Sequence, residues 1–524
     1  MDRLRRGAGQ SLGRGGDMNR ASLALALLIL TAVWAAAEEP SPGWTLISPL
    51  MTTDAYLIDL DESVVMTWHG ADRPATIAYL LPDGSILRPC RAEGGQFASG
   101  GEGGRIQRID AEDHVVWDFL FSTYEYQQHH DIEPMPNGHV LMIAYERKTL
   151  EEAVEAGRIG ADGEMWPTLL VEVEPTGATE GEVVWEWHLW DHLIQDVDPE
   201  KQNYGVIADH PELLDVNAGH VPQGGGDWDH ANAVDYHAEL DQILISCRAT
   251  SEIYIIDHST TTEEAAGHTG GNRGHGGDFL YRWGNPQVYD RGDSTDQYFY
   301  AEHGGNWIDA GLAGEGNILV FNNGDRPELF NDYSTVDEID PPMDDQGNYL
   351  LAPDSAFGPS APAWTYGEPG EFYGGPTHCG AYRMPNGNTL ICASRTHELF
   401  EVTEEGTLVW DYQVPEGRLS RAPRYAVPTS GGSWASGASR RTLPGLVVEP
   451  NPARGAIHLR CSDGFGAAGR IGIFDVTGAR VREIHPPHAA RELMIAPIGL
   501  APGAYFLRLH AGGRVTTRRF LWAG

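Results

Sequence analysis

Short apolar segments separated by turns recur along most of the chain. Six four-residue segments share an apolar or aromatic residue two positions before an aromatic one, usually with tryptophan between them or at the end. Several follow a glycine turn and a stretch of alternating apolar and polar residues, which is the pattern of a β-hairpin. The six segments are residues 65–68, 116–119, 184–187, 280–283, 363–366 and 409–412.

A second pattern precedes the first in several of these units. A Pro-Asx-Gly turn is followed directly by an apolar strand, starting at Pro82, Pro136 and Pro385, with a looser copy at residues 314–319. Glycine supplies the positive φ that such a turn requires, and the residues after it read as a buried strand.

The repeated unit of strand, turn, strand, turn and tryptophan-bearing strand predicts one antiparallel sheet. Six copies in roughly 400 residues favour an all-β, six-bladed β-propeller with four-stranded blades. An all-β sandwich also contains such hairpins, but six related units favour the propeller. Long insertions at residues 189–229 and 258–278 break the spacing, and long loops on a rigid scaffold commonly carry binding surfaces.

A change of composition predicts a second domain. Residues 428–445 are rich in Ser, Gly, Ala and Arg and are interpreted as a linker. Residues 446–524 hold ten arginines and five acidic residues, a net charge of +5, whereas residues 38–445 hold 21 basic and 68 acidic residues, a net charge of −47. Alternating apolar positions in the tail predict a small β-sandwich. We therefore expect a propeller at 38–427 and a separate C-terminal domain at 446–524.

The N-terminal segment has the pattern of an export signal. A short apolar stretch at residues 22–33 follows several arginines and ends near three alanines at 35–37. This pattern predicts a cleaved signal peptide at residues 1–37, with an uncleaved anchor as the alternative. We expect the mature chain to be exported without a transmembrane anchor.

Charge and composition exclude two classes of function. The formal net charge of −39 over 524 residues argues against non-specific nucleic-acid binding, which needs a basic surface. Lys148 and Lys201 are the only lysines, and neither follows a glycine-rich phosphate loop. Five cysteines without CxxC spacing do not predict a zinc site, and the sequence does not decide whether Cys379 and Cys392 form a disulfide.

Four histidines open corresponding strands of the predicted blades. They are His130, His230, His303 and His378, and Arg248 lies on the strand after His230. Because innermost strands line the channel of a propeller, these side chains are expected to converge. Neighbouring cations keep an imidazole neutral and stabilise an anion, which favours sulfuryl or phosphoryl transfer through a covalent histidine intermediate. A metal site and ordinary histidines bonded to backbone remain alternatives.

Other histidines give weaker signals. His188 and His192 are spaced like metal ligands on a helix but lack a third ligand, so a loop role is favoured. His268 and His275 lie in a glycine-rich insertion that is interpreted as a surface loop or lid. The acidic residues at 344–348 are interpreted as a solvated turn rather than a calcium loop.

The segments around these histidines resemble the arylsulfate sulfotransferase family over about residues 43–415. This resemblance implies an exported six-bladed propeller that moves a sulfuryl group from an aryl sulfate to a phenolic acceptor. It also implies that neither a cofactor nor the nucleotide donor 3′-phosphoadenosine 5′-phosphosulfate is used. The segments that carry it are residues 43–49, 227–236, 241–248, 252–262, 281–286 and 385–392.

The resemblance also implies a role for each residue. His303 corresponds to the transiently sulfated nucleophile, with His230 and Arg248 as sulfate-site partners and His130 as the supporting histidine. His378 is a blade-equivalent candidate for substrate binding.

Two features of the same motifs complete this assignment. Asn232, two residues after His230, is the second candidate for substrate binding. The chain departs from the family at Gly304-Gly305, where many relatives have Asp-Ala directly after the nucleophile.

The tail resembles the immunoglobulin-like C-terminal modules of exported bacterial proteins, which are related to flagellar-hook-capping-type and type IX secretion sorting domains. The residues that carry this resemblance are 451–452, 475–481 and 500–505. It implies contact with export machinery and a periplasmic, cell-surface or secreted location.

The sequence as a whole predicts an exported aryl sulfotransferase that works by a ping-pong route through a sulfohistidine. The alternative is a surface propeller that binds sulfated or other anionic ligands without turning them over.

Overall fold

The computed structural model shows an all-β chain, as the sequence predicts. It describes residues 39–427, apart from 220–225, 327–332 and 371, and residues 446–522 with several short gaps. The predicted signal peptide and the predicted linker lie outside the described residues.

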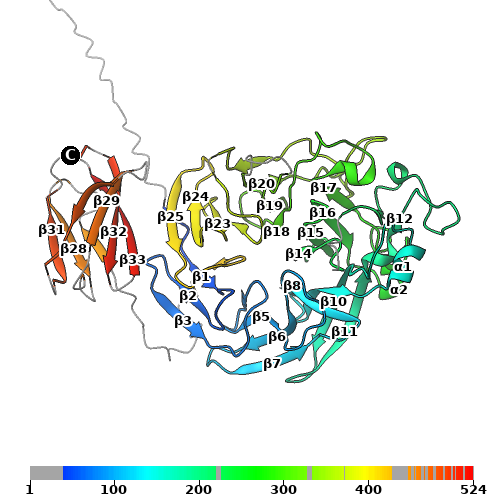
Figure 1. Ribbon diagram of the computed structural model, residues 1–524, viewed down its shortest axis with the longest axis horizontal. Coiled ribbons are helices and arrows are strands. Elements are labelled where there is room, and N and C mark those ends of the chain that lie inside the picture. The colour runs from blue at the N-terminus through cyan, green and yellow to red at the C-terminus, as the bar shows by residue number, and fades with distance from the viewer. Residues whose placement is uncertain are drawn as a thin grey trace, which may run out of the picture. The chain divides into compact units, whose positions relative to one another are not determined.

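Within the described part of residues 44–425, the strands form six four-stranded antiparallel sheets, named sheet 1 to sheet 6 in chain order. Figure 1 shows these sheets arranged in a ring, with β8, β14 and β18 toward the centre and β7 and β11 on the rim. Sheet 1 is β26 (Arg424–Tyr425), β1 (Trp44–Ile47), β2 (Ala55–Ile58) and β3 (Val64–Trp68). Sheet 2 is β4 (Tyr79–Leu80), β5 (Ile86–Arg91), β6 (Gly104–Ile109) and β7 (Val115–Leu120). Sheet 3 is β8 (Tyr126–Pro134), β9 (Val140–Glu146), β10 (Thr168–Pro175) and β11 (Gly181–His188).

The other three sheets have the same order, in which consecutive strands of the chain pair with one another. Sheet 4 is β14 (Ala231–His237), β15 (Gln242–Cys247), β16 (Glu252–Asp257) and β17 (Tyr281–Trp283). Sheet 5 is β18 (His303–Trp307), β19 (Ile318–Asn322), β20 (Thr335–Ile339) and β21 (Trp364–Tyr366). Sheet 6 is β22 (Gly380–Arg383), β23 (Thr389–Ala393), β24 (Glu398–Val402) and β25 (Leu408–Gln413).

Sheet 1 joins two distant parts of the chain. The late strand β26 pairs with β1, with Trp44 opposite Tyr425 and Thr45 opposite Arg424. This pairing satisfies the backbone of an edge that would otherwise be exposed, and it ties the sixth sheet back to the first.

The tryptophan-containing repeat forms the outermost strand of each of the six sheets. In every sheet a tryptophan of this strand donates its Nε1–H to an oxygen of the sheet that follows, and sheet 6 reaches sheet 1. The repeat therefore supplies one hydrogen bond between each pair of neighbouring sheets. The bonds run from Trp68 to Asp110 O, Trp117 to Glu180 O, Trp185 to Thr260 Oγ1, Trp283 to Pro359 O, Trp364 to Glu404 O and Trp410 to Leu60 O, at 2.8–3.2 Å.

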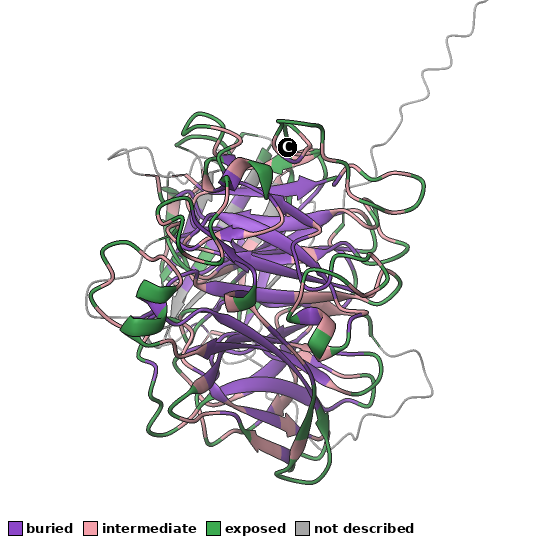
Figure 2. Ribbon diagram, turned by 90° about the vertical axis from the view of Figure 1, so that its right-hand side faces the viewer, coloured by how far each residue is buried: buried purple, intermediate pink, exposed green. Residues whose placement is uncertain are grey.

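The hydrophobic core lies between neighbouring sheets. Leu46 and Leu57 of sheet 1 pack with Ile86 and Ile109 of sheet 2, and each later pair of neighbours shares a similar cluster. The last cluster joins sheet 6 to Ile47 and other residues of sheet 1. Figure 2 shows the same division, with the strands mostly buried and the exposed residues gathered in the loops.

The two long insertions contribute short elements of their own. Residues 189–229 contain η1 (Leu189–Asp191), β12 (Leu193–Ile194), η2 (Ile207–Asp209) and β13 (Leu214–Asp215), and β12 pairs with β13 in parallel. Residues 258–278 contain α2 (Thr262–Ala265), which begins with a capping box between Thr261 and Glu264. The remaining short helices are α1 (Leu150–Glu155) and η3 (Pro286–Tyr289).

The C-terminal residues form two antiparallel sheets. One contains β27 (Leu446–Glu449), β28 (Ile457–Cys461) and β31 (Glu492–Ile495), and the other contains β30 (Arg480–Ile484), β29 (Arg470–Asp475), β32 (Gly503–Ala511) and β33 (Arg514–Trp522). Ile457 and Leu459 of the first sheet share a buried cluster with Ile471 and Leu507 of the second, so the two sheets enclose one core.

Four cysteines of the ring are buried thiols. Cys90, Cys247, Cys379 and Cys392 form no disulfide. Burial raises the pKa of the Cys379 thiol to about 12, which keeps the group protonated and unreactive at neutral pH.

Candidate functional site

Local backbone strain marks the positions of three of the predicted histidines. His130, His230 and His378 all have positive φ angles, of 50°, 54° and 61°. Such a conformation is unfavourable for a residue with a Cβ atom, and three of the residues that adopt it here are histidines of the predicted site. The pairing of β8 with β9 also shifts register across His130, and this bulge turns its side chain away from the regular alternation of the strand.

A glycine makes room for the His130 ring. A Cβ atom on Gly101 would lie 2.3–2.4 Å from three atoms of that ring, so only glycine allows this backbone to pass over it. The backbone N–H of His130 donates to Gly101 O at 2.7 Å, which fixes the strained residue in place.

The structure brings the histidines together, although they are far apart in the sequence. The rings of His130 and His230 pack edge to face with centroids 4.8 Å apart, and those of His303 and His378 lie 6.4 Å apart. Burial, and then the neighbouring histidines, lower the pKa of both His130 and His303 well below the ordinary histidine value. Burial also lowers the pKa of His378, to about 4, with Arg418 and His230 adding to the effect.

His303 is held in one tautomer by Asn323. The amide of Asn323 donates from Nδ2 to Gly375 O at 2.7 Å and to His378 O at 3.0 Å, which fixes its orientation and leaves Oδ1 as an acceptor. Oδ1 lies 2.8 Å from His303 Nδ1, and Ala301 O lies 3.0 Å from the same atom. Nδ1 therefore carries the proton, and the Nε2 lone pair of this buried ring is free to attack.

His230 is paired with a carboxylate that the sequence did not single out. Its Nδ1 hydrogen-bonds Asp227 Oδ2, which also accepts from Ser99 Oγ. Burial raises the pKa of Asp227, but the bonds from His230 and Ser99 outweigh burial and hold it below its usual value. The site therefore contains an acid that orients a histidine.

Arg248 approaches the cluster from the strand next to β14. Its backbone N–H donates to His230 O at 3.1 Å, and its Nη2 donates to Asp325 Oδ2 at 3.2 Å. Its positive charge contributes to the lowered pKa of His303, after burial, His378 and His230. The Arg248 guanidinium therefore lies close enough to the His303 ring to affect its protonation.

Asn232 holds the backbone on both sides of His303. Its Nδ2 donates to Glu302 O at 2.8 Å, and its Oδ1 accepts from Gly304 N at 3.2 Å and from Ser246 Oγ at 3.1 Å. Both polar atoms of this buried amide are thus engaged with protein groups. Asn232 therefore fixes the backbone that carries His303, and its predicted contact with substrate stays a prediction.

The departure at Gly304 has a local physical reason. Gly304 has a φ of +67°, and a Cβ atom there would lie 3.1 Å from both Cys379 O and Gly380 Cα. An aspartate at this position would combine a strained backbone conformation with a tight contact to β22.

Sequence reasoning also missed His129 and Asn323. The Nδ1 atoms of His129 and His130 lie 2.8 Å apart, so one ring donates to the other and only Nε2 of His130 can face a ligand. Burial lowers the pKa of His129 to about 3. The sequence shows His129 directly beside His130, which is a signal that could have been used. The contact of Asn323 with His303 joins the ends of two neighbouring strands, β19 and β18, and no short sequence pattern indicates it.

In the part of the chain that the structure describes, the one group of three metal-ligand atoms within 4.8 Å of one another lies outside this cluster. The cluster instead combines histidines, among them His130, His303 and His378 with lowered pKa values, with one guanidinium. An arrangement of this kind is suited to an anion and to attack on it by a ring nitrogen.

Replacing Asn323 with aspartate should change the pH dependence of a reaction that uses His303. In the wild-type protein the lowered pKa keeps His303 unprotonated as the pH falls below 6.5. A carboxylate 2.8 Å from Nδ1 would raise that pKa, so the variant should lose activity at a higher pH, by about one unit or more. The pH profile of kcat/KM measures the shift. The exposed-turn variant Asn386→Asp should keep the wild-type profile, and an unchanged profile in Asn323→Asp would contradict the assigned tautomer.

The ring of sheets gathers four histidines and an arginine at one buried place, and the comparisons with known proteins bear on what this site does. The family model for arylsulfotransferase (ASST) matches residues 94–339, which include His130, His230, Arg248 and His303. The model for the secretion system C-terminal sorting domain matches residues 448–522. Residues 94–339 therefore match the arylsulfotransferase family model, and the chain also carries a type IX secretion sorting domain.

No curated protein matches the chain. Among solved structures, it is similar to a protein of unknown function from Bacteroides caccae, with 12% identity, coverage of 73% of this chain and 98% of the other, and a TM-score of 0.36. It is also similar to virginiamycin B lyase from Staphylococcus aureus, with 8% identity, coverage of 72% and 83%, and a TM-score of 0.34. Values this low carry no argument about function.

The sorting domain marks the protein as exported, to the cell surface or the medium. Among the described residues, no helix combines the length and the apolar character needed to cross a membrane.

Proposed function

We propose that this protein is an exported aryl sulfotransferase that moves a sulfuryl group from an aryl sulfate to a phenol through a sulfohistidine at His303. The observation that carries the proposal is the Asn323–His303 pair, which presents a neutral imidazole nitrogen among histidines and an arginine. The arylsulfotransferase family match over this region supports the same chemistry.

In the first half-reaction, His303 Nε2 attacks the sulfur of the aryl sulfate, and the bond from sulfur to the phenolic oxygen breaks. The electron pair of that bond leaves on the phenolate. The ring becomes an N-sulfonated imidazolium, and its Nδ1–H still donates to Asn323 Oδ1 and Ala301 O. Those two oxygens stabilise the positive ring as it forms.

Arg248, His230 and His130 bind the sulfuryl oxygens and the leaving oxygen in this proposal. Asp227 accepts from His230 Nδ1, so His230 Nε2 faces the substrate, and in this proposal the protonated His230 ring gives its Nε2 proton to the departing phenolate. In the second half-reaction His230 Nε2 takes the proton of the acceptor phenol, whose oxygen attacks sulfur. The bond from sulfur to His303 Nε2 breaks, its electron pair returns to the ring, and neutral His303 is restored. His378 lies beside the nucleophile and completes the wall of the site.

We further propose that the six sheets are the blades of a β-propeller at residues 38–427 and that the histidines line its channel. The closed series of tryptophan hydrogen bonds and shared cores between neighbouring sheets supports this reading. Residues 1–37 would be the signal peptide, 428–445 a linker, and 446–524 an immunoglobulin-like module that export machinery recognises.

A nitrophenyl sulfate assay with and without an added phenol tests the proposal. Colour release that depends on the phenol, together with a sulfuryl adduct on the His303 peptide in mass spectra, is expected for the transferase. Release without acceptor would indicate hydrolysis. Binding of the aryl sulfate without release would indicate the alternative, an anion-binding module.

Replacing Arg248 with lysine should slow transfer by roughly 30- to 1,000-fold. Lysine keeps the charge but loses the planar guanidinium that can hold two sulfuryl oxygens at once. The loss corresponds to about 2–4 kcal/mol of transition-state stabilisation, by analogy with the removal of one preorganised oxyanion donor. The phenol-release rate measures it. Arg108→Lys is the matched control, because Arg108 pairs with the exposed Asp83 on a different sheet. If Arg248→Lys reacts as fast as the control, Arg248 does not bind the sulfuryl group.

A further inference from the structure

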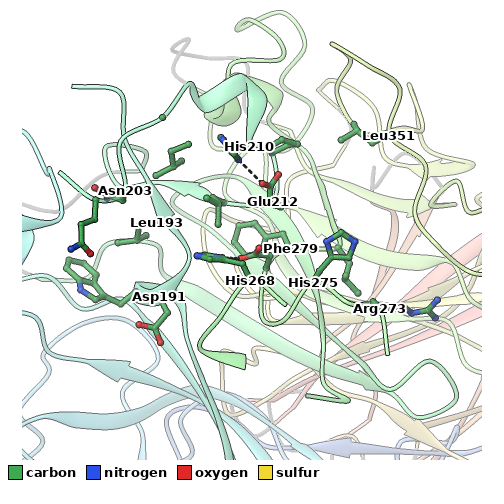
Figure 3. A pocket seen from close by; sticks show the side chains of 18 of the residues that line it. Asp191, Leu193, Asn203, His210, Glu212, His268, Arg273, His275, Phe279 and Leu351 are labelled. Atoms are coloured by element: carbon green, nitrogen blue, oxygen red, sulfur yellow. Dashed lines mark hydrogen bonds and ion pairs between the residues drawn. The ribbon is translucent and has the colours of Figure 1, made fainter. Parts of the chain in front are cut away.

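A cavity that is separate from the histidine cluster is built mainly from the two long insertions, at residues 189–229 and 258–278. It has a volume of about 1340 Å³. Residues from the 189–229 insertion, among them Leu193, His210 and Glu212, face residues of the 258–278 insertion, among them His268 and His275 (Figure 3). None of these residues belongs to the histidine cluster around His303.

Three side chains with metal-binding atoms lie at one side of this cavity: His268 and Asp278 line it, and the buried His192 contacts Asp278. Ligand atoms of His192, His268 and Asp278 all lie within 4.8 Å of one another. Nδ1 of His192 and Nδ1 of His268 each lie 2.8 Å from the same oxygen, Asp278 Oδ1. His192 is fully buried and Asp278 nearly so, whereas the side chain of His268 is 61% exposed. The sequence offered only His188 and His192 as a pair without a third ligand, because the other two residues come from a distant loop.

The hydrogen bonds of His192 point to a cation between these groups. Its Nε2 lies 2.9 Å from Ala265 O, a carbonyl that can only accept, so Nε2 carries a proton. In a neutral ring Nδ1 then has a lone pair, and it faces a carboxylate oxygen that is also an acceptor. Two acceptors 2.8 Å apart in a buried place need either a shared proton or a metal ion.

The surroundings of His192 match those of histidines that bind metals. Such histidines usually donate their other ring N–H to a backbone carbonyl or carboxylate, which fixes the ring and its tautomer. Here Ala265 O has that role, and the Trp187 ring stacks on His192 at 5.5 Å with an angle of 8°.

The loop that carries the other ligands is shaped around His192. A Cβ atom on Gly277 would lie 2.0 Å from Ala265 O and 2.7 Å from His192 Nε2, so only glycine fits between them. Gly277 O in turn accepts from Trp187 Nε1 at 2.8 Å. The sequence predicted that residues 267–277 form a surface loop or lid. The C-terminal end of this loop, at Gly277, is bonded to Trp187 of sheet 3.

We propose that His192, His268 and Asp278 bind one divalent transition-metal ion of the zinc class. Two imidazoles and a carboxylate are a ligand set that Zn²⁺ accepts, at 2.0–2.2 Å from each donor. Ligand atoms around such an ion lie roughly 3 Å apart, and the exposed His268 ring can move by the few tenths of an ångström required. Three protein ligands leave at least one position for water or a ligand from the cavity. The proposal does not depend on the sulfotransferase function.

Titration of chelator-treated protein with ZnCl₂, followed by calorimetry, tests the site. One Zn²⁺ per chain and a raised melting temperature are expected, and CoCl₂ should give the visible absorption bands of a four- or five-coordinate ion. His268→Ala and Asp278→Asn should each weaken Zn²⁺ binding at least tenfold. Because His268 is exposed, its replacement should leave the fold intact even if His192→Ala does not fold.

The matched control is His275→Ala, which removes a histidine that lines the same cavity but is not one of the three ligands. It should bind Zn²⁺ like the wild type. Absence of stoichiometric Zn²⁺ binding in the wild type would overturn the proposal and leave a proton shared by His192 and Asp278 as the explanation of the contact. Equal affinity in wild type, His268→Ala and Asp278→Asn would also overturn it, because the ion would then bind elsewhere.

Discussion

Replacement of His303 with alanine is expected to lower the rate of acceptor-dependent phenol release by about 10⁴-fold or more. Loss of the nucleophile in enzymes with covalent intermediates lowers the rate by this factor or more, because the covalent intermediate that the remaining groups stabilise can no longer form. His230 also has an engaged Nδ1, but its partner is the Asp227 carboxylate, whereas the partners of His303 Nδ1 are the neutral oxygens of Asn323 and Ala301. Steady-state rates and mass spectra of the protein after incubation with the donor alone measure the effect.

His237→Ala is the matched control for this experiment. His237 is a partly buried histidine of β14, where it packs against Trp307 at the opposite end of the strand from His230. The control should retain the wild-type rate, and both variants should melt as the wild type does. Near-normal turnover by His303→Ala, or a sulfuryl adduct that persists in it, would exclude His303 as the nucleophile.

Replacement of Asp131 with asparagine is expected to destabilise the ring of sheets by about 3–5 kcal/mol. Asp131 forms a buried ion pair with Arg421, from the segment before β26. Its carboxylate also accepts from Tyr79 Oη of sheet 2 and from Val234 N of sheet 4, each at 3.0 Å. Removal of this charge would leave the Arg421 guanidinium buried without a counter-ion, which is the costly way to break such a pair.

Urea unfolding of Asp131→Asn measures this loss. Asp83→Asn, which removes a carboxylate from an exposed pair with Arg108, should change stability by less than about 1 kcal/mol. Adding Arg421→Met to Asp131→Asn should recover part of the loss, because the unpaired charge is then gone. An unfolding midpoint for Asp131→Asn equal to that of Asp83→Asn would show that the pair does not hold the sheets together.

Much of the fold could be predicted because its signals are local. Each Pro-Asx-Gly turn lies between the first and second strands of a sheet, where a positive φ at glycine is needed, as at Gly84, Gly138 and Gly387. Each tryptophan-containing segment forms the outermost strand. Turn chemistry and period-two alternation act over fewer than ten residues, so they can be read without knowing the partner of any strand.

The candidate site was predictable in part, for the same reason. His230, His303 and His378 lie at or just before the start of a first strand, as predicted, whereas His130 lies in the middle of β8. The positive φ angles of His130, His230 and His378, the Asp227–His230 pair and the Asn323–His303 bond could not be read from the sequence, since each depends on how a bulge or a neighbouring strand is placed. The bonds of Asn232 could not be read either, because a buried amide bonds to whichever backbone groups packing brings to it.

By itself, the sequence determined the strands, the turns, the repeat of six and the histidines that open the inner strands, because hydrophobic periodicity and turn residues act between near neighbours. Only the tertiary structure decided which distant groups meet. The pairing of β26 with β1 closes the ring, and that closure brings Arg421 to Asp131. Packing of one insertion against another brings His268 and Asp278 to His192. Such contacts depend on the burial and hydrogen bonding of the whole chain, which no short segment encodes.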